Sequence, residues 1–476
     1  MRVLFATSEA WPLLKTGGLA DVAYGLPRAL HEEEVDIRLV LPAHPDAVAR
    51  LEAPVEHRET SLDGRPLTLV SGLLPGTGVP VWLVDDPPLF ARAGNPYTTE
   101  DGVPWPDNAR RYYRLSRAAA ALAAGELAPE WRADVLHAND WQTALAPLFL
   151  REYPNRPASL FTIHNLAYRG LFPASTLGLL GLDTGLWQPE GLEFFGELAF
   201  IKGGLHFADA VTTVSPTYAR EIQTAHFGCG LDGVLRARAA NLHGIVNGID
   251  TATWNPATDP HLAARYSEPD ATAKVANRTE LARRVGLADG QGPVIGFIGR
   301  LVEQKGIDLL LPALARLVEQ GARFAFLGSG EPHLEAGLRT AAERHPGAVG
   351  VFLGYDEGLA HLVEAGSDLF LMPSRFEPCG LNQLYSLRYG TPPIVTPTGG
   401  LADTVIDVGV DPKAGNGFHI PHLDAAALAA TVERALLHWE EDRDWRGLQA
   451  RGMAGDYSWN KSAAQYVSLY QSLVNS

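Results

Sequence analysis

Short apolar runs alternate with helix-like segments along the first half of the chain. Arg2–Ala6 and Asp36–Leu41 have the continuous apolar character of buried strands, while Leu19–Glu33 and Ala109–Ala124 carry apolar residues at helical spacing. This alternation predicts a parallel, doubly wound α/β sheet. Further strands are expected at Val135–His137, Leu160–His164 and Ala210–Val214, with a hairpin-like insertion over Arg58–Val84 that turns at Asp63-Gly64.

The same alternation starts again in the second half of the chain. A polar stretch from Asn255 to Gln291 separates the two series, so we place a domain boundary near Gly248 and a connecting region up to about Gly292. An amphipathic helix is expected at Lys461–Leu473. The strands expected in this half are Pro293–Ile298, Arg323–Leu327, Val349–Leu353, Leu369–Met372 and Pro393–Val395, and the helices are Gly306–Glu319, Pro332–Arg344, Leu359–Ala365 and Leu381–Tyr389.

Composition narrows the class of protein. The chain has 476 residues, 46% of them hydrophobic and 20% charged, which indicates a packed protein with two or three domains. A formal net charge of −16 disfavours nucleic acid as the main partner. The two cysteines, Cys229 and Cys379, imply no disulfide framework. The first apolar run is interrupted at Thr7, and no run of ~18 apolar residues follows, so we expect a cytoplasmic protein without a membrane anchor.

One hexapeptide, Thr-Gly-Gly-Leu-Ala-Asp, occurs at Thr16–Asp21 and again at Thr398–Asp403. A glycine turn before a helix lets the backbone approach an anion. In the first copy, the Gly18 amide and the preceding Lys15 are candidates for a phosphate contact, with a tight turn beside a surface lysine as the alternative. The second copy follows Pro397 instead of a lysine, so we predict that it is a scaffold turn.

Two loops in the second half are candidate ligand sites because each follows a strand and precedes a helix. In Gly299–Gly306, Arg300 and Lys305 are suited to a diphosphate, and a solvated basic loop is the alternative. In Arg375–Gln383, Glu377 is suited to accept hydrogen bonds from sugar or ribose hydroxyls, while the Gly380 and Leu381 amides face an anion or a sugar oxygen. Cys379 is either a packing residue or a reactive thiol.

Polar residues at strand ends complete the candidate set. His164 ends one strand, and His137 and Asp140 lie at the end of another. Their spacing does not support a metal site. Asn247 is suited to bind a sugar hydroxyl, although an Asn-Gly turn is the alternative. No G-x-G-x-x-G follows the first strand, which disfavours dinucleotide binding and a nicotinamide dehydrogenase.

In their order and spacing, these motifs resemble the bacterial glycogen synthase family of retaining glucosyltransferases, which is related to plant starch synthases. The resemblance runs from Val3 to about Tyr470. It implies two Rossmann-like domains facing across a deep cleft, the GT-B type of glycosyltransferase fold. Residues 1–247 would form the acceptor-side domain, residues 248–455 the nucleotide-sugar domain, and residues 456–476 a helix that packs back on the first domain.

The resemblance also implies an activity and a set of site residues. Family members transfer glucose from ADP-glucose to the non-reducing end of an α-1,4-glucan and need neither a metal nor an organic cofactor. The family's site residues are carried over by position. The resemblance implies a donor-phosphate contact at Lys15 and Gly18 and a diphosphate contact at Arg300 and Lys305. It also implies that Tyr355 packs on adenine, that Asp21 and Asp140 line the cleft wall, and that the glucose is surrounded by His164, Asn247, Glu377, Cys379, Gly380 and Leu381.

Three positions depart from the family pattern, and two other functions stay open. Tyr385 stands where many retaining enzymes of this fold have a second glutamate, Asn139 where the branch often has histidine, and Thr396-Pro397 where many bacterial members have arginine. The alternatives are a related transferase that uses UDP-glucose or a small acceptor, and a catalytically silent glucan-binding protein.

Overall fold

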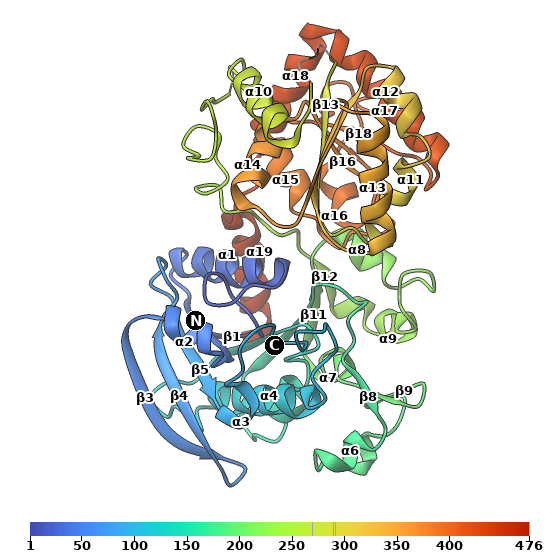
Figure 1. The fold of residues 1–476 in the computed structure, drawn as a ribbon. Coiled ribbons are helices and arrows are strands. Elements are labelled where there is room, and N and C mark those ends of the chain that lie inside the picture. The colour runs from blue at the N-terminus through green and yellow to red at the C-terminus, as the bar shows by residue number, and fades with distance from the viewer. Residues whose placement is uncertain (269, 289, 291, 476) are drawn as a thin grey trace. The chain divides into compact units, whose positions relative to one another are not determined.

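The chain divides into two compact units (Figure 1). The computed structural model describes residues 1–268, 270–288, 290 and 292–475. Unit 1 comprises Met1–Gly248 together with the C-terminal segment from Trp459, and unit 2 comprises Ile249–Ser458. The C-terminal helix therefore belongs to the same unit as the N-terminal strand.

Unit 1 is built on one sheet in the order β12-β11-β7-β6-β1-β2-β5-β4-β3. Its central strands pair in parallel, and Val3–Ala6 of β1 are buried because helices cover both faces of such a sheet. The predicted insertion extends this sheet: β5 pairs in parallel with β2 and antiparallel with β4. The strands are β1 (Arg2–Ala6), β2 (Asp36–Pro42), β3 (Glu52–Leu62), β4 (Arg65–Leu73), β5 (Pro80–Asp85), β6 (Val135–Asn139), β7 (Ala158–Ile163), β11 (Ala210–Thr213) and β12 (Leu242–Gly244).

A small antiparallel sheet and a series of helices complete unit 1. The sheet consists of β8 (Leu171–Pro173), β10 (Glu197–Ala199) and β9 (Glu193–Phe194). The helices are α1 (Gly18–Glu32), α2 (Pro45–Arg50), α3 (Pro87–Phe90), α4 (Asn108–Ala124), α5 (Ala146–Leu150), α6 (Thr176–Leu179), α7 (Ile201–Phe207), α8 (Pro216–Glu221), α9 (Asp232–Ala237) and α19 (Trp459–Val474).

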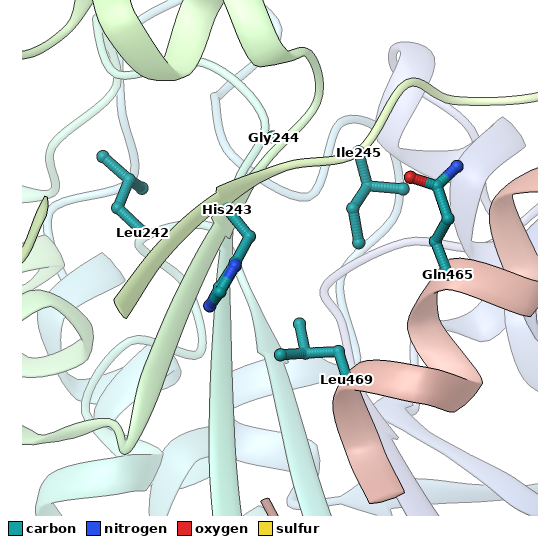
Figure 2. Close-up of a pocket in the computed structure, with 6 residues that line it drawn as sticks. All are labelled: Leu242, His243, Gly244, Ile245, Gln465 and Leu469. Atoms are coloured by element: carbon teal, nitrogen blue, oxygen red, sulfur yellow. The ribbon is translucent and has the colours of Figure 1, made fainter. Parts of the chain in front are cut away.

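Helix α19 is held to unit 1 by close packing and by hydrogen bonds. Gly25 of α1 makes room for Trp459, since a Cβ at Gly25 would lie 1.9 Å from the indole nitrogen. The Tyr470 hydroxyl lies 2.6 Å from Nδ1 of the buried His137. A cavity of about 400 Å³ lies between α19 and the segment around β12, where Gln465 and Leu469 face His243 and Ile245 (Figure 2). Its lining includes none of the predicted site residues.

Unit 2 contains a parallel sheet in the order β15-β14-β13-β16-β17-β18. The strands are β13 (Val294–Ile298), β14 (Arg323–Gly328), β15 (Val349–Leu353), β16 (Leu369–Met372), β17 (Pro393–Val395) and β18 (Phe418–His419). The helices are α10 (Lys274–Val285), α11 (Ile307–Leu310), α12 (Leu314–Glu319), α13 (Pro332–Arg344), α14 (Glu357–Gly366), α15 (Asn382–Arg388), α16 (Gly399–Thr404), α17 (Ala425–Glu440) and α18 (Asp442–Met453).

Two expectations for unit 2 are wrong. The single helix expected over Gly306–Glu319 is divided into α11 and α12, because Pro312 lacks an N–H and interrupts helical hydrogen bonding. Much of the expected connecting region up to Gly292 is folded: it contains α10, whose Leu281 is fully buried in the core, while residues 269, 289 and 291 lie outside the described residues.

Candidate active site

In unit 1 the candidate residues gather where three parallel strands end. Strands β1, β6 and β7 are neighbours, so their carboxyl ends lie at one edge of the sheet. Glu9 follows β1, Asp140 follows β6 and His164 follows β7. Ligands of open α/β sheets bind beyond this edge.

Glu9 holds the first glycine loop and was missed by sequence reasoning. Its carboxylate oxygen Oε2 accepts hydrogen bonds from the Thr16 amide at 2.5 Å and the Thr16 hydroxyl at 2.7 Å. Burial raises the pKa of Glu9, against the lowering effect of these bonds. Gly17 and Gly18 are exposed, and a Cβ at either would meet no atom within 4 Å. The feature of the sequence that could have indicated Glu9 is a carboxylate shortly after the end of a buried strand.

Lys15 and Asp21 lie at the same loop. The Lys15 ammonium is 2.8 Å from an Asp21 oxygen, and the side chains are 38% and 29% exposed. Ion pairs with this much exposure contribute only about 0–1 kcal/mol. A dianionic phosphate can therefore compete with Asp21 for Lys15.

Asp140 supports the backbone at His164. Its own backbone is in the left-handed region at φ +54°, and its Oδ1 accepts a hydrogen bond from the His164 amide at 2.8 Å. Burial raises the pKa of Asp140 to about 7, while the amides of His164 and Asn165 oppose the rise and Glu9 adds to it. Asp140 thus fixes the strand end at His164.

His164 is an uncharged imidazole of defined tautomer. Burial lowers the pKa of His164 to about 3. Its Nε2 lies 2.9 Å from Oδ1 of Asn139, whose amide nitrogen donates to the carbonyls of Ala6 and His137. Because Asn139 presents its oxygen to the ring, Nε2 carries the hydrogen and Nδ1 is an acceptor. Asn139, a departure from the family pattern, therefore orients His164.

The remaining candidates of unit 1 have different surroundings. His137 lies within the sheet, with its ring nitrogens 2.6 Å from Tyr470 and Thr162, and burial lowers its pKa well below the usual value. It is a structural residue. Asn247 is buried in the segment after β12. Within the described ranges, no three His, Cys, Asp or Glu side chains form a group that could hold a metal ion.

In unit 2 the structure brings Lys305 and Glu377 together. Lys305 closes a short 3₁₀ turn, Glu303–Lys305, beyond β13, and its ammonium lies 2.5 Å from Oε2 of Glu377. Ser374 donates to the same oxygen at 3.0 Å. Arg300 lies exposed in the loop directly after β13. Cationic groups therefore lie at the carboxyl ends of the strands, the edge at which a diphosphate would bind.

The second glycine copy packs closely against the backbone of the Glu377 loop. A Cβ at Gly399 would lie 2.0 Å from the Glu377 carbonyl oxygen, and one at Gly400 would lie 2.1 Å from that of Cys379. The Gly400 amide already donates to the Glu377 carbonyl at 3.1 Å. Cys379 is buried and forms no disulfide, as expected of a packing residue.

The other candidates of unit 2 lie in loops: Gly380 and Leu381 are partly buried, and Tyr355 is exposed. Gly380, at φ +71°, and Leu381 lead into α15. Tyr355 follows β15, is 74% exposed, and donates its hydroxyl to the Glu357 carboxylate. An exposed aromatic ring beside the strand ends is suited to stack on a planar base.

Comparison with known proteins identifies the family. Residues 2–237 match the model of the starch synthase catalytic domain, and residues 278–448 match glycosyl transferases group 1. A glycogen synthase of Alkalilimnicola ehrlichii is 69% identical, covering 99% of this chain and 98% of its own. One of Halorhodospira halophila is 65% identical over the full length of both. The chain belongs to the glycogen synthase family.

A solved structure extends this family assignment to the fold. The catalytic domain of Arabidopsis thaliana starch synthase IV, bound to ADP and acarbose, is similar with a TM-score of 0.88 and 35% identity, covering 100% of this chain and 99% of that one. The predicted membership of the glycogen synthase family and the GT-B type fold with two Rossmann-like domains are confirmed. Among the described helices, none is long and apolar enough to cross a membrane.

Proposed function

We propose that this chain transfers glucose from ADP-glucose to the non-reducing end of an α-1,4-glucan with retention of configuration, and so extends glycogen in the cytoplasm. The observation that carries the proposal is the Lys305–Glu377 contact of 2.5 Å at the strand ends of unit 2, with Arg300 exposed in the same loop as Lys305. A structure 35% identical to this chain is described as bound to ADP and acarbose, which supports a nucleotide and a glucan as ligands.

Charge development at the leaving group gives the basic residues their role. Cleavage of the C1–O bond leaves ADP, so negative charge grows on the diphosphate. Arg300, Lys305 and the Gly18 amide would stabilise that charge, and preorganised donors act most strongly where charge develops in the transition state. Lys15 would add positive charge at the donor phosphate. The proposal requires neither a metal nor an organic cofactor.

The sugar side of the reaction uses polar groups that hold the glucose. Glu377 accepts from Lys305 and Ser374, which lowers its nucleophilicity and suits it to orient sugar hydroxyls. The His164 carbonyl would face C1, and Asn247 with the Gly380 and Leu381 amides would bind the hydroxyls. The incoming 4-hydroxyl would attack from the front side and lose its proton to the leaving phosphate. Exclusion of water would prevent hydrolysis of the donor.

A transfer assay tests the function. ADP-glucose labelled in its glucose is incubated with a maltooligosaccharide. We expect one ADP released for each glucose added, a product one residue longer, and loss of the label on digestion with an enzyme specific for α-1,4 links. Absence of glucan-dependent ADP release would contradict the proposal and favour a silent glucan-binding protein. Competition with UDP-glucose tests the donor, and a strong preference for UDP-glucose would overturn the ADP assignment.

A further inference from the structure

Unit 2 contains a buried group of polar and aromatic side chains outside the candidate site. We call it the His361 cluster, and it consists of Trp254, Asp259, His361, Tyr385 and Tyr389. His361, on α14, is 1% exposed. It connects the segment before α10, its own helix and α15.

Carboxylates face both nitrogens of the His361 ring. Nδ1 lies 2.7 Å from Oδ2 of Asp259, and Nε2 lies 3.7 Å from Oε1 of Glu357, one helical turn earlier. The Tyr389 hydroxyl donates to the same Asp259 oxygen at 2.5 Å, and the His261 ring lies 4.8 Å from that of His361. Only the imidazolium form has an N–H for each carboxylate. Burial by itself lowers the pKa of His361, but Asp259 and Glu357 outweigh it, so that the pKa is raised.

Ring stacking fixes the orientation of His361. Its ring lies 3.9 Å from that of Trp254 with 6° between the planes, and Trp254 stacks in turn on Tyr385 at 3.8 Å and 14°. The face of an indole attracts a cation, so this stack also favours the charged imidazole. The cluster thus combines a fixed ring with two charge partners.

Glu357 connects the cluster to the predicted adenine-packing residue. Its side chain is 46% exposed and accepts the hydroxyl of Tyr355. Between them, Asp356 caps α14 by accepting the Leu359 amide at 2.7 Å, and pairs with Arg284 at 2.9 Å. The charge on His361 therefore acts on a carboxylate that contacts Tyr355 directly.

We propose that His361 is a positioning residue: in its charged form it holds Glu357, and through Glu357 the ring of Tyr355, in the orientation that binds the nucleotide base of the donor. The inference rests on the proposed function and on the adenine role of Tyr355. Interactions of a histidine whose pKa is raised on folding are complete at low pH and are lost as the pH rises through that pKa. The KM for ADP-glucose should therefore rise with pH, while kcat changes little.

The test is a pH profile of KM and kcat for ADP-glucose, and of the dissociation constant of ADP, from about pH 6 to about pH 9. Glu357→Gln should raise KM and the ADP dissociation constant roughly three- to tenfold at the acidic end and remove their pH dependence. His361→Gln should do the same. Since His361 is buried, the partly exposed Glu357 provides the variant that keeps the fold. Glu280→Gln, which removes a carboxylate paired with Arg283 on α10, is the matched control and should reproduce the wild-type profile.

Each outcome decides for or against the positioning role. A pH-dependent KM that persists unchanged in Glu357→Gln would overturn it, and so would an equal loss of kcat, since that indicates a role beyond donor binding. Tyr355→Phe keeps the ring and removes the hydroxyl, so it should match Glu357→Gln. An unchanged KM in Tyr355→Phe would contradict the connection. If glucan-dependent ADP release is absent while ADP binding follows the predicted profile, the proposed function fails and the positioning role stands.

Discussion

The two copies of Thr-Gly-Gly-Leu-Ala-Asp begin helices in both units but have opposite surroundings. In the first copy, Gly17 and Gly18 are exposed and open to a ligand. In the second, Gly399 and Gly400 are buried under the backbone of the Glu377 loop. Glycine therefore permits close packing in the second copy, whereas in the first copy we predict that it permits the approach of a ligand. The backbone differs as well: α1 begins at Gly18, the third residue of the hexapeptide, whereas α16 begins at Gly399, the second, which has a positive φ of +47°. The same hexapeptide at the start of a helix therefore does not imply the same role, because the surrounding backbone determines what a residue without a Cβ can do there.

The largest expected effect is on stability, at the second copy. Gly400→Ala would place a Cβ 2.1 Å from the Cys379 carbonyl, so backbone must move. We expect a loss of about 3–5 kcal/mol in the free energy of unfolding, as for other severe steric conflicts in a core. Chemical denaturation checks it. A stability equal to wild type would show that the second loop is as open as the first.

If the second copy only packs against the Glu377 loop, another part of unit 2 must bind the diphosphate, and we predict that Arg300 does so. Arg300→Ala should lower kcat/KM by about 2–4 kcal/mol of transition-state stabilisation, which is the range for one preorganised charge donor. Steady-state kinetics at varied ADP-glucose measure it, with thermal unfolding to verify the fold. An unchanged rate with intact donor affinity would remove Arg300 from the site.

The third prediction concerns the buried carboxyl groups of unit 1, where Glu9 holds the first copy and Asp140 supports the backbone at His164; the second copy instead contacts backbone. The pKa of Asp140 is about 7, above its unfolded value, so the native state binds the proton more tightly. Its contribution to stability should therefore decline as the pH rises from about 4 to about 7, by on the order of 2–3 kcal/mol.

Asp140→Asn keeps the acceptor for the His164 amide and removes the charge. Melting temperatures measured against pH should then show a flatter decline. The remaining decline is due to other carboxyl groups whose pKa is also raised, among them Glu9 and Glu364. The same slope in wild type and variant would mean that Asp140 is already charged at low pH in the folded protein.

The smallest effect is expected at the first copy. Gly18→Ala adds a methyl group in open space, so stability should change by less than about 1 kcal/mol. The methyl would occupy the approach of the donor phosphate and lower kcat/KM by about 1–2 kcal/mol, comparable to the loss of a charge-assisted hydrogen bond. Measurements of kcat/KM and of the free energy of unfolding on the same preparation of the variant check both expectations. An inactive and unfolded variant would contradict the contrast between the copies.

Much of the fold follows from local pattern. The expected strands Arg2–Ala6, Val349–Leu353, Leu369–Met372 and Pro393–Val395 match β1, β15, β16 and β17 residue for residue. Strands of a parallel sheet that are covered on both faces are continuous apolar runs, and β15 is also apolar although it lies at the sheet edge and Phe352 is partly exposed. Pro312 could have indicated that the helix expected over Gly306–Glu319 is interrupted, but the helical spacing of apolar residues continues on both sides of it, so a single helix was predicted.

The candidate site was less accessible to sequence reasoning. The ends of the predicted strands indicated which residue types to examine. The contact of Glu9 with Thr16 spans only seven residues, but it lies in an irregular loop that has no periodic pattern. The contact that orients His164 joins it to Asn139, 25 residues earlier and at the end of a different strand. The packing of Gly400 under the Glu377 loop is likewise a tertiary contact.

A crystal structure of the protein with ADP and a maltooligosaccharide tests the contrast between the two copies most directly. We expect the diphosphate at Arg300 and Lys305, with a phosphate contact from Lys15 or the Gly18 amide, and no ligand at Gly399 or Gly400. A diphosphate bound at the start of α16, on the second copy, with the first copy empty, would contradict the account.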